Sequence, residues 1–228
     1  MGNEKEIMNL LDRLFLLSAA FIAIYMILGL ISRQRQAETS HVSNIYHIVA
    51  FSVLLISEFL LVIFGWGILG LMGTGLGNKL LAIVASLIPF AWATGLVAKV
   101  YPQHEKLYLS AMFLGLILIS ISRFMEMPVF ARIIYPVFHS TAGMTVILLP
   151  FLAVKKGMAS KVFLWVATAG ALISLGGISL AFLASGKQLL IFSRPIMLSV
   201  LAPLLFVTSF AYMWGLSHGE DLSPDDSK

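Results

Sequence analysis

The chain has no cysteine among its 228 residues. This absence excludes disulfides, thiolate metal sites, iron–sulfur ligation and cysteine nucleophiles. Charged residues are also scarce, at 11% of the chain, whereas a soluble globular domain carries about a quarter. Hydrophobic residues make up 59% of the chain and its mean hydropathy is +0.96, so water cannot be its main solvent. We therefore expect an integral membrane protein.

Long polar stretches are missing between the apolar runs of the sequence. A hydrocarbon core about 30 Å thick needs about 20 apolar residues for each helical crossing. Charge, proline and glycine separate the runs and predict seven helices, at residues 12–32, 44–70, 79–100, 106–124, 129–154, 161–185 and 194–217. The predicted fold is an all-α bundle of seven transmembrane helices, forming one domain over residues 1–217 with an acidic, flexible tail over 218–228.

The formal net charge is +4 and the isoelectric point is near 9.4. In a membrane protein such an excess follows from the rule that orients basic loops, so it does not indicate nucleic-acid binding. Lys and Arg divide almost evenly between the two membrane faces. We favour a cytoplasmic location for the face whose charges cluster in short loops, Arg33, Arg35, Lys99, Lys106, Lys155, Lys156 and Lys161. We expect a multi-pass protein of the cell membrane, with the lipid bilayer and other membrane subunits as its partners.

Two ionisable residues fall deep within predicted helices. An ionisable side chain at the centre of a membrane helix costs roughly 2.5 to 3.5 kcal/mol on insertion scales, which makes Glu58 and His139 candidates for function. The end of the second predicted helix and the start of the fifth lie on the same membrane face. Counting a rise of about 1.5 Å per residue from these two ends places Glu58 and His139 at a similar depth. The alternative is that the two groups hydrogen-bond each other, or backbone carbonyls, and only hold two helices in register.

Helical spacing brings other polar groups onto the faces that carry these two residues. On the second predicted helix His47 shares the face of Glu58, and on the fifth Arg132 and Tyr135 share the face of His139. We predict that these five residues form a site that handles protons or a polar ligand.

Other candidate sites are weaker. Arg123 and Glu126 lie three residues apart at a helix end, and this spacing predicts an interfacial ion pair. A bis-histidine haem b needs two imidazoles at one depth, whereas His47 and His139 lie near opposite faces, so haem b is not expected. The remaining histidines are scattered through loops and predict no metal site. We therefore expect no resident cofactor, and a quinone is the one alternative that the candidate residues leave open.

The leading functional hypothesis is a non-catalytic membrane subunit that handles protons or a quinone, as an accessory subunit of a membrane electron-transfer complex. No serine, histidine and carboxylate gather at a common depth, so the sequence identifies no catalytic residue and leaves the question of an enzyme open, with a preference for none.

A second hypothesis, a small secondary transporter or channel, is based on a short pattern that occurs twice in the sequence, which we call the internal repeat. Phe90, Ala91, Trp92, Gly95 and Leu96 are repeated as Phe210, Ala211, Tyr212, Gly215 and Leu216. A duplication of three helices around a single linking helix would give this pattern, although chance similarity between apolar helices is the simpler explanation. A third hypothesis is a seven-helix sensor that signals through the acidic tail.

The segment ISEF, followed by Trp66, is similar to the glutamate-bearing helix of cytochrome oxidase subunit III, another seven-helix membrane protein without haem. The resemblance implies that Glu58 is a buried acid associated with proton uptake or lipid packing. It covers one short segment, falls in the second helix here and in the third helix of that family, and lacks the family's phenylalanine-rich run. We do not assign the chain to that family.

Overall fold

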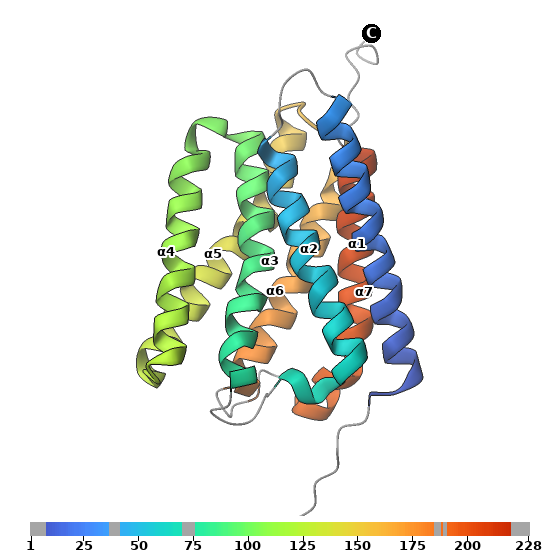
Figure 1. The fold of residues 1–228 in the computed structure, drawn as a ribbon. Helices are drawn as coiled ribbons and strands as arrows, with labels where there is room; N and C mark the ends of the chain where they lie inside the picture. Colours follow the sequence, from blue (N-terminus) through green and yellow to red (C-terminus); the bar gives the residue numbers. More distant parts are fainter. Residues whose placement is uncertain (1–7, 37–41, 70–75, 185–187, 189–190, 220–228) are drawn as a thin grey trace, which may run out of the picture.

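The computed structural model describes residues 8–36, 42–69, 76–184, 188 and 191–219. They form seven α-helices, each long and apolar enough to cross a membrane, so the chain is a multi-pass membrane protein (Figure 1). The all-α seven-helix bundle predicted from the sequence is confirmed. The helices are α1 (Leu10–Gln36), α2 (Val42–Phe64), α3 (Leu76–Val100), α4 (Glu105–Phe124), α5 (Pro128–Lys155), α6 (Leu164–Ala184) and α7 (Arg194–Gly219).

Six of the helices form a closed ring, and the remaining helix, α4, lies outside it. Around the ring α1 packs on α2, α2 on α3, α3 on α5, α5 on α6, α6 on α7, and α7 on α1. Helix α4 packs against the outer side of α3 and α5, at one edge of the molecule (Figure 1). The interior of the ring is therefore the place where side chains can be sheltered from lipid.

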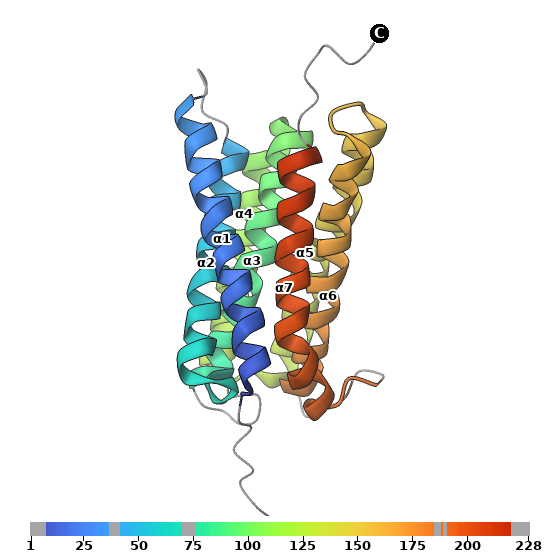
Figure 2. The ribbon, with the colours of Figure 1, turned by 90° about the vertical axis from the view of Figure 1, so that its right-hand side faces the viewer.

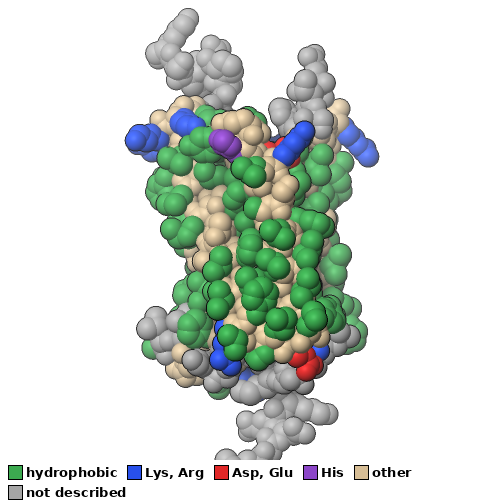
Figure 3. Space-filling view, turned by 90° about the vertical axis from the view of Figure 1, so that its left-hand side faces the viewer, with side chains coloured by type: hydrophobic (Ala, Val, Ile, Leu, Met, Phe, Trp, Pro, Cys, Tyr) green, Lys and Arg blue, Asp and Glu red, His purple; other side chains and the backbone are tan. Residues whose placement is uncertain are grey.

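The two ends of the bundle are distinct. Helix α1 begins at one end and α7 finishes at the other (Figure 2), and we call these ends the N-terminal face and the C-terminal face. On the side of the molecule that carries α4, Lys, Arg, Asp and Glu side chains gather at the two ends and leave a hydrophobic band between them (Figure 3). This distribution is what a bilayer requires, because charges are stable only at its two polar surfaces.

Helix α2 is shorter than the sequence pattern predicts. The predicted span of 44–70 is interrupted at Gly65, which adopts a positive φ of 69° and donates its N–H to the carbonyl of Leu61 at 2.8 Å. A left-handed residue directly after the last helical turn ends a helix, and glycine adopts this conformation at least cost. The chain then makes a short 3₁₀ turn, η1 (Trp66–Leu69), beneath the bundle.

The substitution Gly65→Ala is expected to destabilise the protein by about 1 kcal/mol, because a Cβ is strained at positive φ. The nearest atom to the new methyl group would be the Cβ of Met8 at 3.9 Å, so crowding adds nothing. Gly67→Ala is the matched control, since no atom lies within 4 Å of the new Cβ and its φ is not in the left-handed region. Thermal unfolding of both variants in detergent should show a loss for Gly65→Ala alone, and equal stability would contradict a capping role.

Both ends of the seventh predicted helix can be compared with the structure. Helix α7 begins at Arg194 as predicted, and continues to Gly219, two residues into the predicted tail. Residues 220–228 of that tail lie outside the described residues.

Candidate functional site

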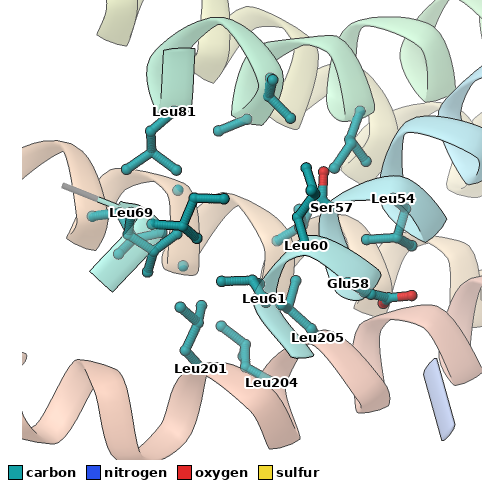
Figure 4. Close-up of a pocket in the computed structure, with 18 of the residues that line it drawn as sticks. Leu54, Ser57, Glu58, Leu60, Leu61, Leu69, Leu81, Leu201, Leu204 and Leu205 are labelled. Atoms are coloured by element: carbon teal, nitrogen blue, oxygen red, sulfur yellow. The ribbon is translucent and has the colours of Figure 1, made fainter. Parts of the chain in front are cut away.

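A cavity of about 250 Å³ lies inside the ring, in the half of the bundle nearer the N-terminal face. Its wall is built by α2, η1, α3, α5, α6 and α7, and consists mainly of leucine, isoleucine and valine side chains (Figure 4). The polar residues of this lining are Ser57, Glu58 and His139. Ser57 satisfies itself by donating its hydroxyl to the carbonyl of Val53 at 2.7 Å.

Glu58 is completely buried, and neither carboxyl oxygen has a hydrogen-bond partner among the described residues. Figure 4 places its carboxyl at the edge of the cavity beside Leu54, on the side away from Leu69 and Leu81. A buried polar group without a hydrogen bond costs roughly 2 to 7 kcal/mol. The carboxyl is therefore available to hydrogen-bond a molecule that enters the cavity.

His139 is the second unsatisfied group of this cavity. Its side chain is buried, and neither Nδ1 nor Nε2 has a hydrogen-bond partner within the described part of the chain. The ring is stacked on Tyr135, with centroids 5.1 Å apart and planes 16° from parallel. The Nε2 edge of the ring fits against Gly177 of α6, where an added Cβ would lie 2.2 Å from Nε2. Tyr135 and Gly177 therefore fix the imidazole from two sides.

Glu58 and His139 are related by the cavity rather than by direct contact. Helices α2 and α5 each pack on α3, and the two side chains form no hydrogen bond or ion pair with each other. Glu58 lies six residues before the end of α2, and His139 lies eleven residues after the start of α5. The alternative in which the two groups satisfy each other, or bond to backbone carbonyls, is not what the described residues show.

The cavity reaches the lipid-facing surface between α2 and α3. Leu60 and Leu80 line it and are also 39% and 43% exposed. In Figure 1 these two helices lie close together near the C-terminal face and diverge toward the N-terminal face. We infer that the cavity opens sideways toward the hydrocarbon layer.

The structure brings Tyr135 to this site but not Arg132. Tyr135 is buried beside His139, whereas Arg132 is exposed. An arginine from the neighbouring helix takes the predicted place, because the guanidinium of Arg123 in α4 lies 5.9 Å from the centre of the Tyr135 ring. A helical face spans more than one neighbour, so spacing within α5 could not show which charge meets Tyr135.

The predicted ion pair between Arg123 and Glu126 is wrong. Glu126 instead pairs with Lys79 of α3, at 3.0 Å between Nζ and Oε1. Helix α4 ends at Phe124 and Glu126 has a positive φ of 54°. The rule that residues three apart are neighbours holds only within a helix, and these two residues lie on either side of its end.

His47 belongs to a different cluster. It is buried on α2 like Glu58, but its Nε2 lies 3.3 Å from the Ser43 hydroxyl and its Nδ1 lies 3.3 Å from the hydroxyl of Tyr212. Ser43 also donates to the carbonyl of Gly95 at 2.8 Å. The structure therefore satisfies His47 near the C-terminal face and does not bring it to the cavity.

The sequence analysis did not predict that Gly177 makes room for the ring of His139, although the spacing of small residues on helix six indicates close packing there. Small residues follow a regular spacing on helix six, at Gly170, Ser174, Gly177, Ala181 and Ser185, which is typical of close helix packing. The first three meet α5 at Val146, Gly143 and His139 respectively, while Ser185 and the side chain of Ala181 lie outside the described residues.

Comparison of the chain with protein-family models, curated proteins and solved structures gave no match.

Proposed function

We propose that this protein binds a lipid-soluble molecule with a polar head, of the quinone type, and handles protons at that head through Glu58 and His139. The observation that carries the proposal is the pair of unsatisfied polar side chains, both buried, that share one aliphatic cavity. In this proposal the chain acts in the cell membrane as a non-catalytic module of a larger electron-transfer complex.

The chemistry of the wall fits an amphipathic ligand. A carboxyl and an imidazole can each donate or accept a hydrogen bond, depending on protonation. A quinone carbonyl needs a donor, and the hydroxyl of the corresponding quinol needs an acceptor, so this pair can serve both states. The surrounding leucines offer no hydrogen bond and suit an aliphatic tail.

The size and opening of the cavity fit the same class of ligand. Sites for drug-sized molecules span about 300 to 1,000 Å³, and this cavity, at about 250 Å³, is just below that range. It can take a head group and the first part of a tail. The remainder of the tail would leave between Leu60 and Leu80 into the bilayer, where such molecules are stored.

The role of an accessory subunit follows from what the cavity side chains can do. A carboxyl and an imidazole exchange protons, but they supply no electrons. Any redox cycle of a bound quinone would therefore need another subunit as its electron donor or acceptor.

Purification in mild detergent, followed by organic extraction and mass spectrometry, tests the proposal. We expect the wild-type chain to retain a quinone-like molecule. Glu58→Leu and His139→Ala should each lower its occupancy by about tenfold, because each removes one buried hydrogen bond to the ligand, and leaving a buried polar group unpaired costs about 1 to 3 kcal/mol, of which about 1.4 kcal/mol already corresponds to a factor of ten.

Ser57→Ala is the matched control. Ser57 lines the same cavity but bonds to its own helix, so its loss should leave occupancy unchanged. The proposal would be overturned if the Glu58 and His139 variants retained as much ligand as the wild-type chain, or if the extract contained no amphipathic ligand.

A further inference from the structure

The ring divides into two three-helix units that pack in the same way. In the first unit α1 packs on α2 and α2 on α3, and in the second α5 packs on α6 and α6 on α7. The two large contacts between the units are α3 with α5 and α7 with α1, and α3 also makes a smaller contact with α6. Exchanging the two units maps each of the large contacts onto another, and leaves α4 outside as the linking helix. Helices four apart also cross the membrane in the same direction.

More than half of the buried positions on α1 and α2 match buried positions on α5 and α6, although buried Leu16 and Leu54 match exposed Pro136 and half-buried Ile173. On α1 and α5 the matched residues lie 120 positions apart, and on α2 and α6 they lie 119 apart. All of the following are buried: Ala19, Ala23, Met26 and Leu30 with His139, Gly143, Val146 and Pro150, and His47, Ala50, Phe51 and Glu58 with Val166, Ala169, Gly170 and Gly177. Corresponding helices thus turn the same face inward.

Close glycine contacts also recur at matching places. In the first unit Gly95 of α3 admits His47 of α2, whose Cε1 would lie 2.5 Å from an added Cβ. In the second unit Gly215 of α7 admits Val166 of α6, whose backbone nitrogen would lie 2.7 Å from an added Cβ. Val166 is the counterpart of His47. In each unit, therefore, a glycine on the third helix lets the second helix pack closely against it near the C-terminal face.

Two residues at matching positions of the internal repeat contact each other at the centre of the bundle. Trp92 of α3 and its counterpart Tyr212 of α7 are stacked, with centroids 4.0 Å apart and planes 13° from parallel. A residue can touch its own counterpart only on the axis that relates the two units. Packing, burial and this contact favour a duplication over chance similarity.

The stacked pair closes the inner end of the cavity. Trp92 lies one turn beyond Ile88, which lines the cavity on α3, and Phe51 lies about one turn beyond Leu54 on α2. Phe51 packs edge-to-face on Trp92 and Tyr212, and all three side chains are completely buried. The cavity is therefore sealed toward the C-terminal half, and its opening is the sideways one beside Leu60 and Leu80.

We propose that the chain is a transporter in which the two units rock about the contact between Trp92 and Tyr212. The motion would close the opening beside Leu60 and Leu80 and open an equivalent path toward the C-terminal face. The cargo is an amphipath with a hydrogen-bonding head and an aliphatic tail, whose head passes between the faces while held by Glu58 and His139. Only this chemical class depends on the function proposed above, and the rocking itself does not.

Site-directed labelling tests the motion, and the absence of native cysteine makes it direct. Ser57→Cys places a thiol on the cavity wall with almost no change in volume, and Leu204→Cys is a second reporter on α7. A membrane-impermeant maleimide is applied to each face of oriented vesicles. We expect labelling from the C-terminal face, which the Trp92–Tyr212 stack seals in this structure, at a rate about ten- to a thousandfold below that of an exposed thiol, since minor conformations are commonly populated at 0.1 to 10%.

Ile56→Cys is the matched control, because Ile56 is the neighbour of Ser57 and is 60% exposed on the outer, lipid-facing side. It should remain unlabelled from both faces. Labelling of the two cavity reporters from the N-terminal face alone, or from neither face, would overturn the transport proposal. Labelling from the C-terminal face in protein that retains no amphipath would support the motion while contradicting the proposed ligand, so the two proposals can fail separately.

Discussion

Replacing Gly177 with alanine is expected to lower ligand retention by about tenfold, as loss of the His139 side chain does, and to destabilise the protein by about 1 to 3 kcal/mol, the usual range for overpacking a closed interior. The added Cβ would lie 2.2 Å from Nε2 and 2.6 Å from Cε1 of His139. The imidazole cannot simply turn away, because Tyr135 is stacked against it. The ring must therefore move out of the position from which it faces the cavity.

A double variant separates the two effects of this substitution. In Gly177→Ala combined with His139→Ala the clash is gone, so most of the stability lost in Gly177→Ala should return. Ligand retention should stay low, because the imidazole is missing. Thermal unfolding and mass spectrometry of the same preparations measure both quantities. Full retention of ligand by Gly177→Ala would show that the position of His139 does not matter for binding.

Gly95→Ala is expected to be at least as damaging to stability, at about 3 kcal/mol, but through the other end of the bundle. The new Cβ would lie within 3 Å of three ring atoms of His47, at 2.5, 2.8 and 2.9 Å. His47 is held by Ser43 and Tyr212, and Tyr212 is stacked on Trp92. Overpacking at such a site forces either the ring or the backbone to shift.

Gly29→Ala provides the control for an alanine placed in a helix, since nothing lies within 4 Å of its Cβ. It should be neutral or slightly stabilising, because alanine is the better helix former. The pair Gly95→Ala and His47→Ala should be strongly non-additive, as residues in contact are. Additive losses would mean that the clash is not the source of the damage.

Part of the site was accessible from the sequence because the bilayer makes one rule very strong. A charged group inside a membrane helix must be sheltered, so Glu58 and His139 stand out against their apolar neighbours, and both are buried. Helical spacing also placed Tyr135 correctly beside His139. The same spacing failed for Arg132, because a face that looks continuous on one helix can meet the ring interior at one turn and the surface at the next.

The number of helices, the all-α fold and the burial of the two ionisable residues were determined by the sequence itself, because length, hydropathy and the cost of charge in lipid are local properties. The tertiary structure decided the rest: the stop at Gly65, the approach of Arg123 to Tyr135, the aliphatic cavity and the stacking of Trp92 on Tyr212. These features depend on how far each helix is rotated and how closely small residues let neighbours approach. Both are set by packing between segments distant in sequence.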